Sequence, residues 1–452
     1  MGDGSFQRCS LLNRSAQGVL QLSGNSIGQN RIISNQESCR KRFHFARLWR
    51  MMFTPHPIRG AAKDASKQAR KNCDTSDRTM SSISTFEPFY ASKEDALRTG
   101  HVLRPVARAV AVLRSGDAVI LRSQNPDEPA MLLASAESGW KDHAFTQVVM
   151  GARQAALFGL NVPDSLPSAV VFTWPEGEDI GLFSAAPSDV SDALKQAELH
   201  KAGAVEQAAL RLLKYALRLP VGLLSPLQAD EVENFISEYG IVSVEVDSVE
   251  QYPQAAAQSL QVAGDAHVPL KLAENARVLA FRQPHGMEEH LAIVIGDPLA
   301  VEAPLVRLHS SCVTGDILGS LRCDCGDQLQ AALARIAESG QGIVLYLNQE
   351  GRGIGLANKL KAYALQEAGM DTVTANEALG FDADERDFTM AAAMLRQLGI
   401  EQLRLLTNNP RKVSALETAG ITITERVPLA IKANPHNADY LKTKEQKCGH
   451  LF

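Results

Sequence analysis

Two short stretches, His309-Ser-Ser-Cys-Val-Thr-Gly-Asp316 and Ser320-Leu-Arg-Cys-Asp-Cys-Gly-Asp327, bring three of the chain's seven cysteines close together. Thiolates spaced as Cys312-x10-Cys323-x-Cys325 are typical of a metal site. Three protein ligands leave one zinc position open for water, as in catalytic sites, whereas a structural zinc needs a fourth ligand such as His309. A disulfide is a further alternative, although an acidic chain without a secretory signal argues against it.

Strand and helix patterns alternate on both sides of the cysteines, which predicts an α/β fold with mixed sheets. Runs of apolar residues predict strands over 277–282, 291–295, 305–309, 342–347 and 403–406. Apolar residues at helical spacing predict helices over 327–338, 356–368, 388–398 and 412–419.

The region 95–235 predicts an α/β domain of its own. Residues 96–111 mix helical and strand-like spacing, and strands are expected over 117–121, 130–135 and 170–174. A long amphipathic helix is expected over 192–218, and Ser225-Pro226 with the polar, acidic residues after it is expected to start a further helix. The polar stretch 251–267 predicts a linker.

Composition narrows the class of protein. A chain of 452 residues implies two or three domains, and 45% hydrophobic with 21% charged residues is ordinary for a globular protein. No apolar run reaches the ~20 residues that span a bilayer. The net charge is −5, yet residues 1–80 are strongly basic, so the rest is acidic and unlike a nucleic-acid binder. Of a transit peptide, a disordered arm and residues upstream of the true start codon, we favour a disordered or artefactual leader.

A glycine-rich stretch, Glu350-Gly-Arg-Gly-Ile-Gly355, lies between a predicted buried strand and a predicted helix. Backbone N–H groups of such a turn bind phosphate at a helix N-terminus, although a flexible loop would have the same composition. A dinucleotide site is the other alternative, with Asp371 at a suitable distance, but its glycine spacing differs from this one.

Two polar junctions also precede predicted helices. Asp384-Glu-Arg-Asp387 suits a general base paired with a phosphate-binding arginine, or charges that complement the helix dipole. In Thr407-Asn-Asn-Pro-Arg-Lys412, an Asn and Pro410 suit the start of a helix. Thr407 and Lys412 are then placed to contact a phosphate or hydroxyl, although a plain helix cap explains all but the lysine.

Taken in order, these motifs strongly resemble GTP cyclohydrolase II, from about residue 271 to the C-terminal Gly449-His-Leu-Phe452. The resemblance implies a zinc-dependent hydrolase that opens GTP at C8 of guanine and releases formate and pyrophosphate. The product would be 2,5-diamino-6-ribosylamino-4(3H)-pyrimidinone 5′-phosphate, the first intermediate of riboflavin biosynthesis. Cys312, Cys323 and Cys325 would hold the zinc, whose bound water attacks C8.

The resemblance also implies the roles of other residues. Asp384 matches the family's proton acceptor, Arg386 its proposed nucleophile, and Tyr363 a tyrosine near the ring-opening chemistry. Because a guanidinium stays protonated, stabilising phosphate charge is the physically easier role for Arg386. The positions matching the GTP site are Arg307, Leu308, His309, Ser310, Ser311, Gln328, Glu350, Gly351, Arg352, Thr372, Thr407 and Lys412.

The remaining expectations follow from the same resemblance. Mg²⁺ would accompany the triphosphate, and the enzyme would be a cytoplasmic homodimer with no nucleic-acid or membrane partner. Ser311 stands where many relatives carry Glu, a change that we expect to leave activity intact. The alternatives are a GTP-binding paralogue of pyrimidine catabolism and a non-catalytic nucleotide-binding regulator.

The N-terminal half resembles 3,4-dihydroxy-2-butanone 4-phosphate synthase, through 107–117, 130–137 and 213–228. The acidic metal-binding run of that family is replaced by Ser123-Gln-Asn-Pro-Asp-Glu-Pro129, which predicts a degenerate, inactive relative. A coincidental α/β domain is the alternative. The predicted organisation is a leader over 1–80, the synthase-like domain over 81–250, a linker over 251–270 and the catalytic domain over 271–452.

Overall fold

The computed structural model describes residues 93–140, 145–166, 168–175, 190–286, 288–429, 431 and 434–437. These residues all belong to one compact unit, Thr85–Phe452. The predicted leader and the C-terminal Gly449–Phe452 motif lie outside the described residues. Among the residues that the structure describes, no helix is both long and apolar enough to span a membrane.

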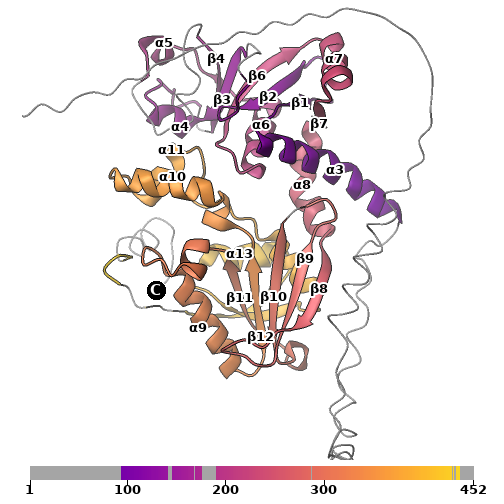
Figure 1. Ribbon diagram of the computed structural model, residues 1–452, viewed down its shortest axis with the longest axis vertical. Coiled ribbons are helices and arrows are strands. Elements are labelled where there is room, and N and C mark those ends of the chain that lie inside the picture. The colour runs from indigo at the N-terminus through magenta and orange to yellow at the C-terminus, as the bar shows by residue number, and fades with distance from the viewer. Residues whose placement is uncertain are drawn as a thin grey trace, which may run out of the picture. The chain divides into compact units, whose positions relative to one another are not determined.

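The described strands form two seven-stranded sheets (Figure 1). The first, in the N-terminal half (Lys93–Gln258), has the order β5-β4-β3-β6-β2-β1-β7. Its central strands are buried on both faces, so β2 is apolar from Ala130 to Ala134 without alternation. The strands are β1 (Val119–Arg122), β2 (Ala130–Ser135), β3 (Gln147–Gly151), β4 (Ala169–Thr173), β5 (His200–Lys201), β6 (Val221–Leu227) and β7 (Val242–Glu245).

Helices cover both faces of the first sheet. One face packs against α3 (Lys93–Ser115), α6 (Ala204–Tyr215) and α8 (Val246–Gln258). The other face packs against α4 (Ala152–Leu157), α5 (Asp192–Lys195) and α7 (Ala229–Tyr239).

The second sheet, in the C-terminal half (261–437), has the order β14-β13-β11-β12-β10-β9-β8. The strands β12, β11, β13 and β14 run parallel, so their carboxyl ends lie along one edge. The strands are β8 (Gln261–His267), β9 (Ala276–Arg282), β10 (Glu289–Ile295), β11 (Leu305–Ser310), β12 (Gly342–Leu347), β13 (Gln402–Leu406) and β14 (Thr422–Val427).

The second sheet is also a sandwiched layer. Helix α9 (Cys325–Glu338) packs on one face, and α12 (Thr389–Gln397) with α13 (Pro410–Thr418) packs on the other. Helices α10 (Leu356–Glu367) and α11 (Thr372–Ala378) form a separate small core, which takes in Leu219 from the N-terminal half. The short turns are η2 (Pro298–Ala300), the π-helical η3 (Val313–Ile317) and η4 (Glu350–Gly353).

The mixed α/β class and the two-sheet architecture agree with the sequence-based prediction. The single helix expected over 192–218 was wrong, because α5, β5 and α6 replace it. Leu194 of α5 is buried on one face of the first sheet, whereas the apolar stripe of α6 is buried on the other. The chain therefore has to cross from face to face, and Gly203 precedes the new helix.

Other local predictions also need correction. The stretch expected to be a linker contains the end of α8 and the whole of β8. Strand β8 pairs antiparallel with β9 but is largely exposed, so its polar sequence lacks the usual strand pattern. Ser225 and Pro226 lie inside β6, so the helix expected there starts only at Ala229, as α7. Helix α3 is helical throughout the mixed 96–111 stretch.

Candidate metal and nucleotide site

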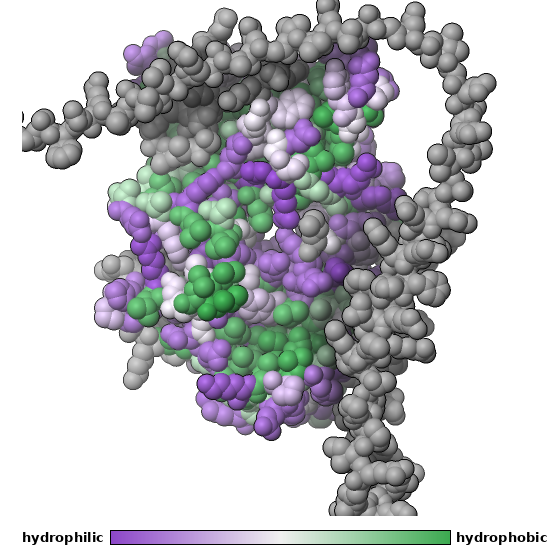
Figure 2. Space-filling model, viewed as in Figure 1, coloured by the Kyte–Doolittle hydropathy of each residue, from purple (hydrophilic) through white to green (hydrophobic). Residues whose placement is uncertain are grey.

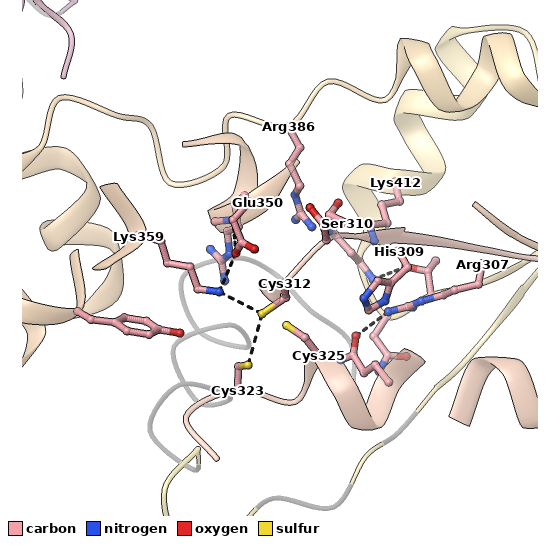
Figure 3. Close-up of a pocket in the computed structure, with 18 residues that line it drawn as sticks. Arg307, His309, Ser310, Cys312, Cys323, Cys325, Glu350, Lys359, Arg386 and Lys412 are labelled. Carbon is pink, nitrogen blue, oxygen red and sulfur yellow. Dashed lines mark hydrogen bonds and ion pairs between the residues drawn. The ribbon is translucent and has the colours of Figure 1, made fainter. Parts of the chain in front are cut away.

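A pocket of about 110 Å³ opens where β11, β12 and β13 end. Open parallel sheets bind ligands at this edge, because the loops that follow neighbouring strands converge there. Figure 3 shows the three cysteines at the centre of the site. The pocket is lined by Arg307, His309, Ser310, Ser311, Cys312, Cys323, Cys325, Gln328, Glu350, Gly351, Arg352, Lys359, Tyr363, Arg386, Thr407, Asn408, Asn409 and Lys412.

The three cysteines form one cluster. Their sulfur atoms lie within 4.8 Å of one another, and those of Cys312 and Cys323 are 3.7 Å apart, far beyond a disulfide bond. Cys325 is the first residue of α9, so the helix begins at this cysteine and not just after it as predicted. Among the described residues, these three cysteines form a group whose sulfur atoms are close enough together to share one metal ion.

The turn between the first two cysteines is shaped around their sulfur atoms. The N–H group of Gly315, in η3, donates to Cys312 Sγ at 3.3 Å. A Cβ atom at Gly315 would lie 2.9 Å from Cys323 Sγ and 3.2 Å from Cys312 Sγ. A side chain at this position would therefore force the thiols apart.

Lys359 provides positive charge beside the cluster. Its Nζ atom donates to Cys312 Sγ at 3.0 Å, to Thr314 Oγ1 at 2.8 Å and to Glu350 Oε1 at 2.8 Å. Burial by itself lowers the pKa of the Lys359 ammonium, but the hydrogen bonds to Glu350 and Cys312 outweigh it and hold the pKa above its ordinary value. The lysine is therefore a fixed cation.

The cysteines respond to one another and to this cation. The pKa of Cys312 lies far below that of an ordinary thiol, because the Cys323 and Cys325 thiols donate to its sulfur, with Thr314 and Lys359 adding to the effect. The pKa of Cys323 is raised, chiefly because its proton is shared with Cys312. The cluster therefore favours the thiolate form of Cys312.

His309 supports the site, but its Nε2 atom is paired with Asp316 and is not one of the clustered metal-ligand atoms. Its Nε2 atom lies 3.1 Å from both carboxylate oxygens of Asp316, and its ring stacks on Tyr346. Asp316 in turn accepts a hydrogen bond from the backbone N–H of Cys312 at 3.0 Å. Three soft thiol donors, with no fourth ligand beside them among the described residues, fit zinc with an open position.

Two buried cations face the other side of the pocket. The Arg307 guanidinium donates to the Leu406 carbonyl and to Gln328 Oε1, while its buried Nε atom has no hydrogen-bond partner in the described protein. Burial lowers the pKa of Arg307 to about 10. Lys412 Nζ donates to the Leu308 carbonyl at 2.7 Å. Cations held this deep in a protein favour an anionic ligand.

Arg386 and Asp384 form a two-pronged ion pair. Arg386 Nε and Nη2 each lie 2.7 Å from a different oxygen of Asp384. Burial would raise the pKa of Asp384, but Arg386, with Arg352 and Arg411, outweighs it and keeps the pKa below its ordinary value. Arg386 lines the pocket, whereas Asp384 lies directly behind it.

The glycine-rich turn holds the third side of the pocket. Gly351 and Arg352 both have left-handed backbone angles, with φ of 65° and 62°. Glu350 accepts from the Val313 N–H at 2.6 Å and so ties this turn to the first cysteine loop. Tyr363 of α10 lies beneath the Arg322 guanidinium, 5.1 Å from the ring centre.

Most of the predicted site residues meet in this pocket, with three exceptions. Leu308 points into the core of the second sheet, and Thr372 begins α11 outside the pocket lining. Asp384 contacts Arg386 without lining the pocket. Asp371 caps α11 by accepting from the Val373 N–H and does not line the pocket.

Three pocket residues were missed by the prediction: Lys359, Asn408 and Asn409. The side chain of Asn409 caps α13, as the Asn-Pro junction predicted, and the side chain of Asn408 pairs with both backbone groups of Leu429. Lys359 gave no signal, because a lysine inside a helix usually lies on the surface.

Comparison with known proteins places the site in a family. A family model described as GTP cyclohydrolase II matches residues 261–428. The GTP cyclohydrolase-2 of Azospirillum brasilense is 40% identical over 366 residues, which cover 77% of this chain and 94% of that protein. The chain belongs to the GTP cyclohydrolase II family. It is therefore an enzyme of the hydrolase class, and the resemblance drawn from the motifs is confirmed.

Other relatives match a shorter part of this chain. The GTP cyclohydrolase-2 of Cronobacter sakazakii is 60% identical over 175 residues, which cover 39% of this chain and 89% of that protein. The riboflavin biosynthesis protein RibBA of Bacillus velezensis is 58% identical over 177 residues, 39% of this chain and 44% of that protein. A stretch of 175 residues of this chain thus corresponds to nearly the whole of the Cronobacter sakazakii protein.

Proposed function

We propose that this enzyme opens the guanine imidazole ring of GTP, releasing formate and pyrophosphate, and so begins riboflavin biosynthesis. The observation that carries the proposal is the meeting of three free cysteines with Arg307, Arg386 and Lys412 in one pocket. The thiol cluster and the cations would act on different parts of GTP. The thiol cluster would hold the metal ion beside the guanine base, and the cations would bind the triphosphate.

The cations would bind and orient the triphosphate. Arg307 and Lys412 are buried, and charge–charge attraction strengthens where water is excluded. Arg386, fixed by Asp384, would meet the charge that develops at phosphorus as pyrophosphate leaves. Mg²⁺ on the triphosphate stays a prediction from the family resemblance.

Cys312, Cys323 and Cys325 would hold zinc. When bound, zinc would supply a Lewis acid and lower the pKa of a water molecule, which hydrolysis of the ring requires. Lys359 holds negative charge on Cys312, and Gly315 keeps the sulfur atoms within reach of one ion. Tyr363 lines the pocket beside Lys359, and in this proposal its hydroxyl exchanges a proton with the opening ring.

The N-terminal half has a structural role in this proposal. We place the boundary between the halves at Ser259–Leu260, between α8 and β8, and not at the predicted residue 271. The family model also begins at residue 261.

The paralogue of pyrimidine catabolism stays an alternative, which only analysis of the reaction product can distinguish from the proposed enzyme.

A homodimer stays a prediction, with one supporting observation. Three large apolar side chains of the loop between the first two cysteines, Ile317, Leu318 and Leu321, are more than half exposed. The face drawn in Figure 2 likewise carries green hydrophobic patches among purple side chains. A second subunit would cover such a surface.

Cytoplasmic location is likewise a prediction from the resemblance.

The decisive experiment is incubation of the purified enzyme with GTP, zinc and Mg²⁺. Formate, pyrophosphate and the diaminopyrimidine should appear in equal amounts. Formate with a different pyrimidine would favour the paralogue, and no formate would contradict the proposal. A matched sample treated with a chelator, then given zinc again, separates metal dependence from loss of folded protein.

A further inference from the structure

Lys214 of α6 reaches from the N-terminal half to the segment that carries the catalytic pair. Its Nζ atom lies 2.6 Å from Glu385 Oε1 and 3.4 Å from Asp382 Oδ2. Glu385 stands between Asp384 and Arg386 in the chain. Its side chain is 17% exposed and that of Lys214 is 26% exposed, so this ion pair is better shielded than most surface pairs.

Glu385 ties its segment to the glycine-rich turn η4. Its Oε1 atom also accepts from the Asp382 N–H at 2.7 Å, and its own N–H donates to the Arg352 carbonyl at 3.1 Å. Arg352 returns a hydrogen bond to the Ala383 carbonyl at 3.1 Å. A Cβ atom at Gly353 would lie 3.0 Å from the Glu385 backbone, so the two segments are in close contact.

A second contact from the N-terminal half lies just beyond η4, at the start of α10. Asn358 Nδ2 donates to the Leu217 carbonyl at 2.9 Å, and a Cβ atom at Gly355 would lie 3.1 Å from Leu217 Cδ1. Leu217 has a φ of 56°, a left-handed conformation that disfavours residues other than glycine. Backbone strain of this kind persists where the surrounding contacts impose it.

We propose that Lys214 is a positioning residue for the cyclohydrolase reaction. By holding Glu385, the N-terminal half fixes Asp384 and Arg386 relative to η4 and the pocket. Without the lysine, a half-buried carboxylate would remain beside Asp382 and Asp384, and their repulsion would displace the segment. This inference rests on the proposed role of Arg386 in the reaction.

The effect should fall on the chemical step. The described contacts of Arg307 and Lys412, which would bind the triphosphate, do not involve Lys214. A displacement of about 1 Å at a reacting group can cost about 100-fold in rate. We therefore expect Lys214→Met to lower kcat by about 10-fold or more, while KM for GTP and zinc content change by less than about 3-fold.

The test compares four full-length enzymes with the wild type. Lys214→Arg keeps the charge and should recover most of the kcat that Lys214→Met loses. Arg211→Met is the matched control, because Arg211 lies one turn earlier on α6 and pairs with Glu250 inside the N-terminal half. It should keep the wild-type kcat. Glu385→Gln breaks the same contact from the other side and should resemble Lys214→Met, which covers the case where one variant folds poorly.

The outcomes separate the two proposals. Unchanged kcat in both Lys214→Met and Glu385→Gln would overturn the positioning role while leaving the proposed function intact. An equal loss in Arg211→Met would also overturn it, since any weakening of the N-terminal half would then suffice. Failure of the wild-type enzyme to release formate would contradict the proposed function, and the role of Lys214 with it.

Discussion

The ammonium group of Lys359 lies 3.0 Å from the sulfur of Cys312 and also contacts the carboxylate of Glu350. The side chain is 11% exposed, and the Lys359–Glu350 pair joins α10, η3 and η4 around one thiolate. A lysine so placed stabilises the anionic form of a ligand sulfur. It also fixes the glycine-rich turn η4, which lines one side of the pocket.

Lys359→Met should weaken zinc binding without unfolding the enzyme. Partners that contact a metal ligand typically account for 10–100-fold in metal affinity, so we expect a loss of about 10-fold or more. Competition with a chromophoric chelator measures it. Lys361→Met, on the same helix but paired with Glu137 of the N-terminal half, is the matched control and should bind zinc as the wild type does.

Replacing any one of the three cysteines by serine should remove zinc and ring opening together. In the proposed site three described side chains would share the ion, so the loss of one should lower affinity and formate release by at least ~100-fold. Metal analysis of purified protein and the formate assay are read on the same samples. Full zinc content in Cys312→Ser, Cys323→Ser or Cys325→Ser would show that the metal lies elsewhere.

His309→Ala distinguishes an open metal site from a closed one. Because the imidazole is held by Asp316 and stacked on Tyr346, this variant should keep its zinc. Its activity should nonetheless fall, since Asp316 loses a partner beside the Cys312 backbone. Loss of the metal would mean that His309 completes a structural zinc site.

Much of the C-terminal half could be predicted from the sequence because its elements obey local rules. The apolar runs of β11 and β12 and the Asn409-Pro410 cap of α13 each carry their own signal. The order of motifs then placed most of the pocket. Lys359 could not be found this way, because its role depends on where α10 packs against η3.

The N-terminal half was harder to predict for a similar reason. The residues of 192–218 satisfy a helical pattern, yet Leu194 and Val205 are buried on opposite faces of one sheet. The contact of Lys214 with Glu385 spans 171 positions of the chain. No local pattern encodes such a pair.

Arg386→Ala should damage phosphate chemistry and leave the metal in place. Loss of a group that stabilises transition-state charge costs about 10²–10³ in kcat, and Arg386 makes no described contact with the cysteines. Steady-state kinetics and metal analysis of the variant test both parts. Zinc loss would indicate instead that the pair with Asp384 serves folding.

Buried histidine should make the fold sensitive to mild acid. Burial lowers the pKa of His290 below 6.5, and its Nδ1 atom accepts from the Asn348 N–H. The unfolded chain therefore binds a proton near pH 6.5 that the folded chain does not. The contribution of His290 to the free energy of unfolding is therefore fully present above pH 6.5. It is lost as the pH drops toward the folded pKa, with a slope of at most ~1.4 kcal/mol per pH unit. Denaturant unfolding at pH 7.5 and 5.5 should show a smaller difference in His290→Asn than in the wild type.

The N-terminal half should not make dihydroxybutanone phosphate from ribulose 5-phosphate. The loop 123–129 joins β1 to β2 and is almost wholly exposed, with Asp127 and Glu128 as its only acidic residues. A Mg²⁺ site needs several oxygen ligands held around one ion, and two exposed neighbouring carboxylates do not provide it. Full-length enzyme that is active on GTP should therefore give no butanone phosphate when incubated with ribulose 5-phosphate and Mg²⁺. Product formation at a rate comparable with formate release would show that the half is a working synthase and not a support for the cyclohydrolase site.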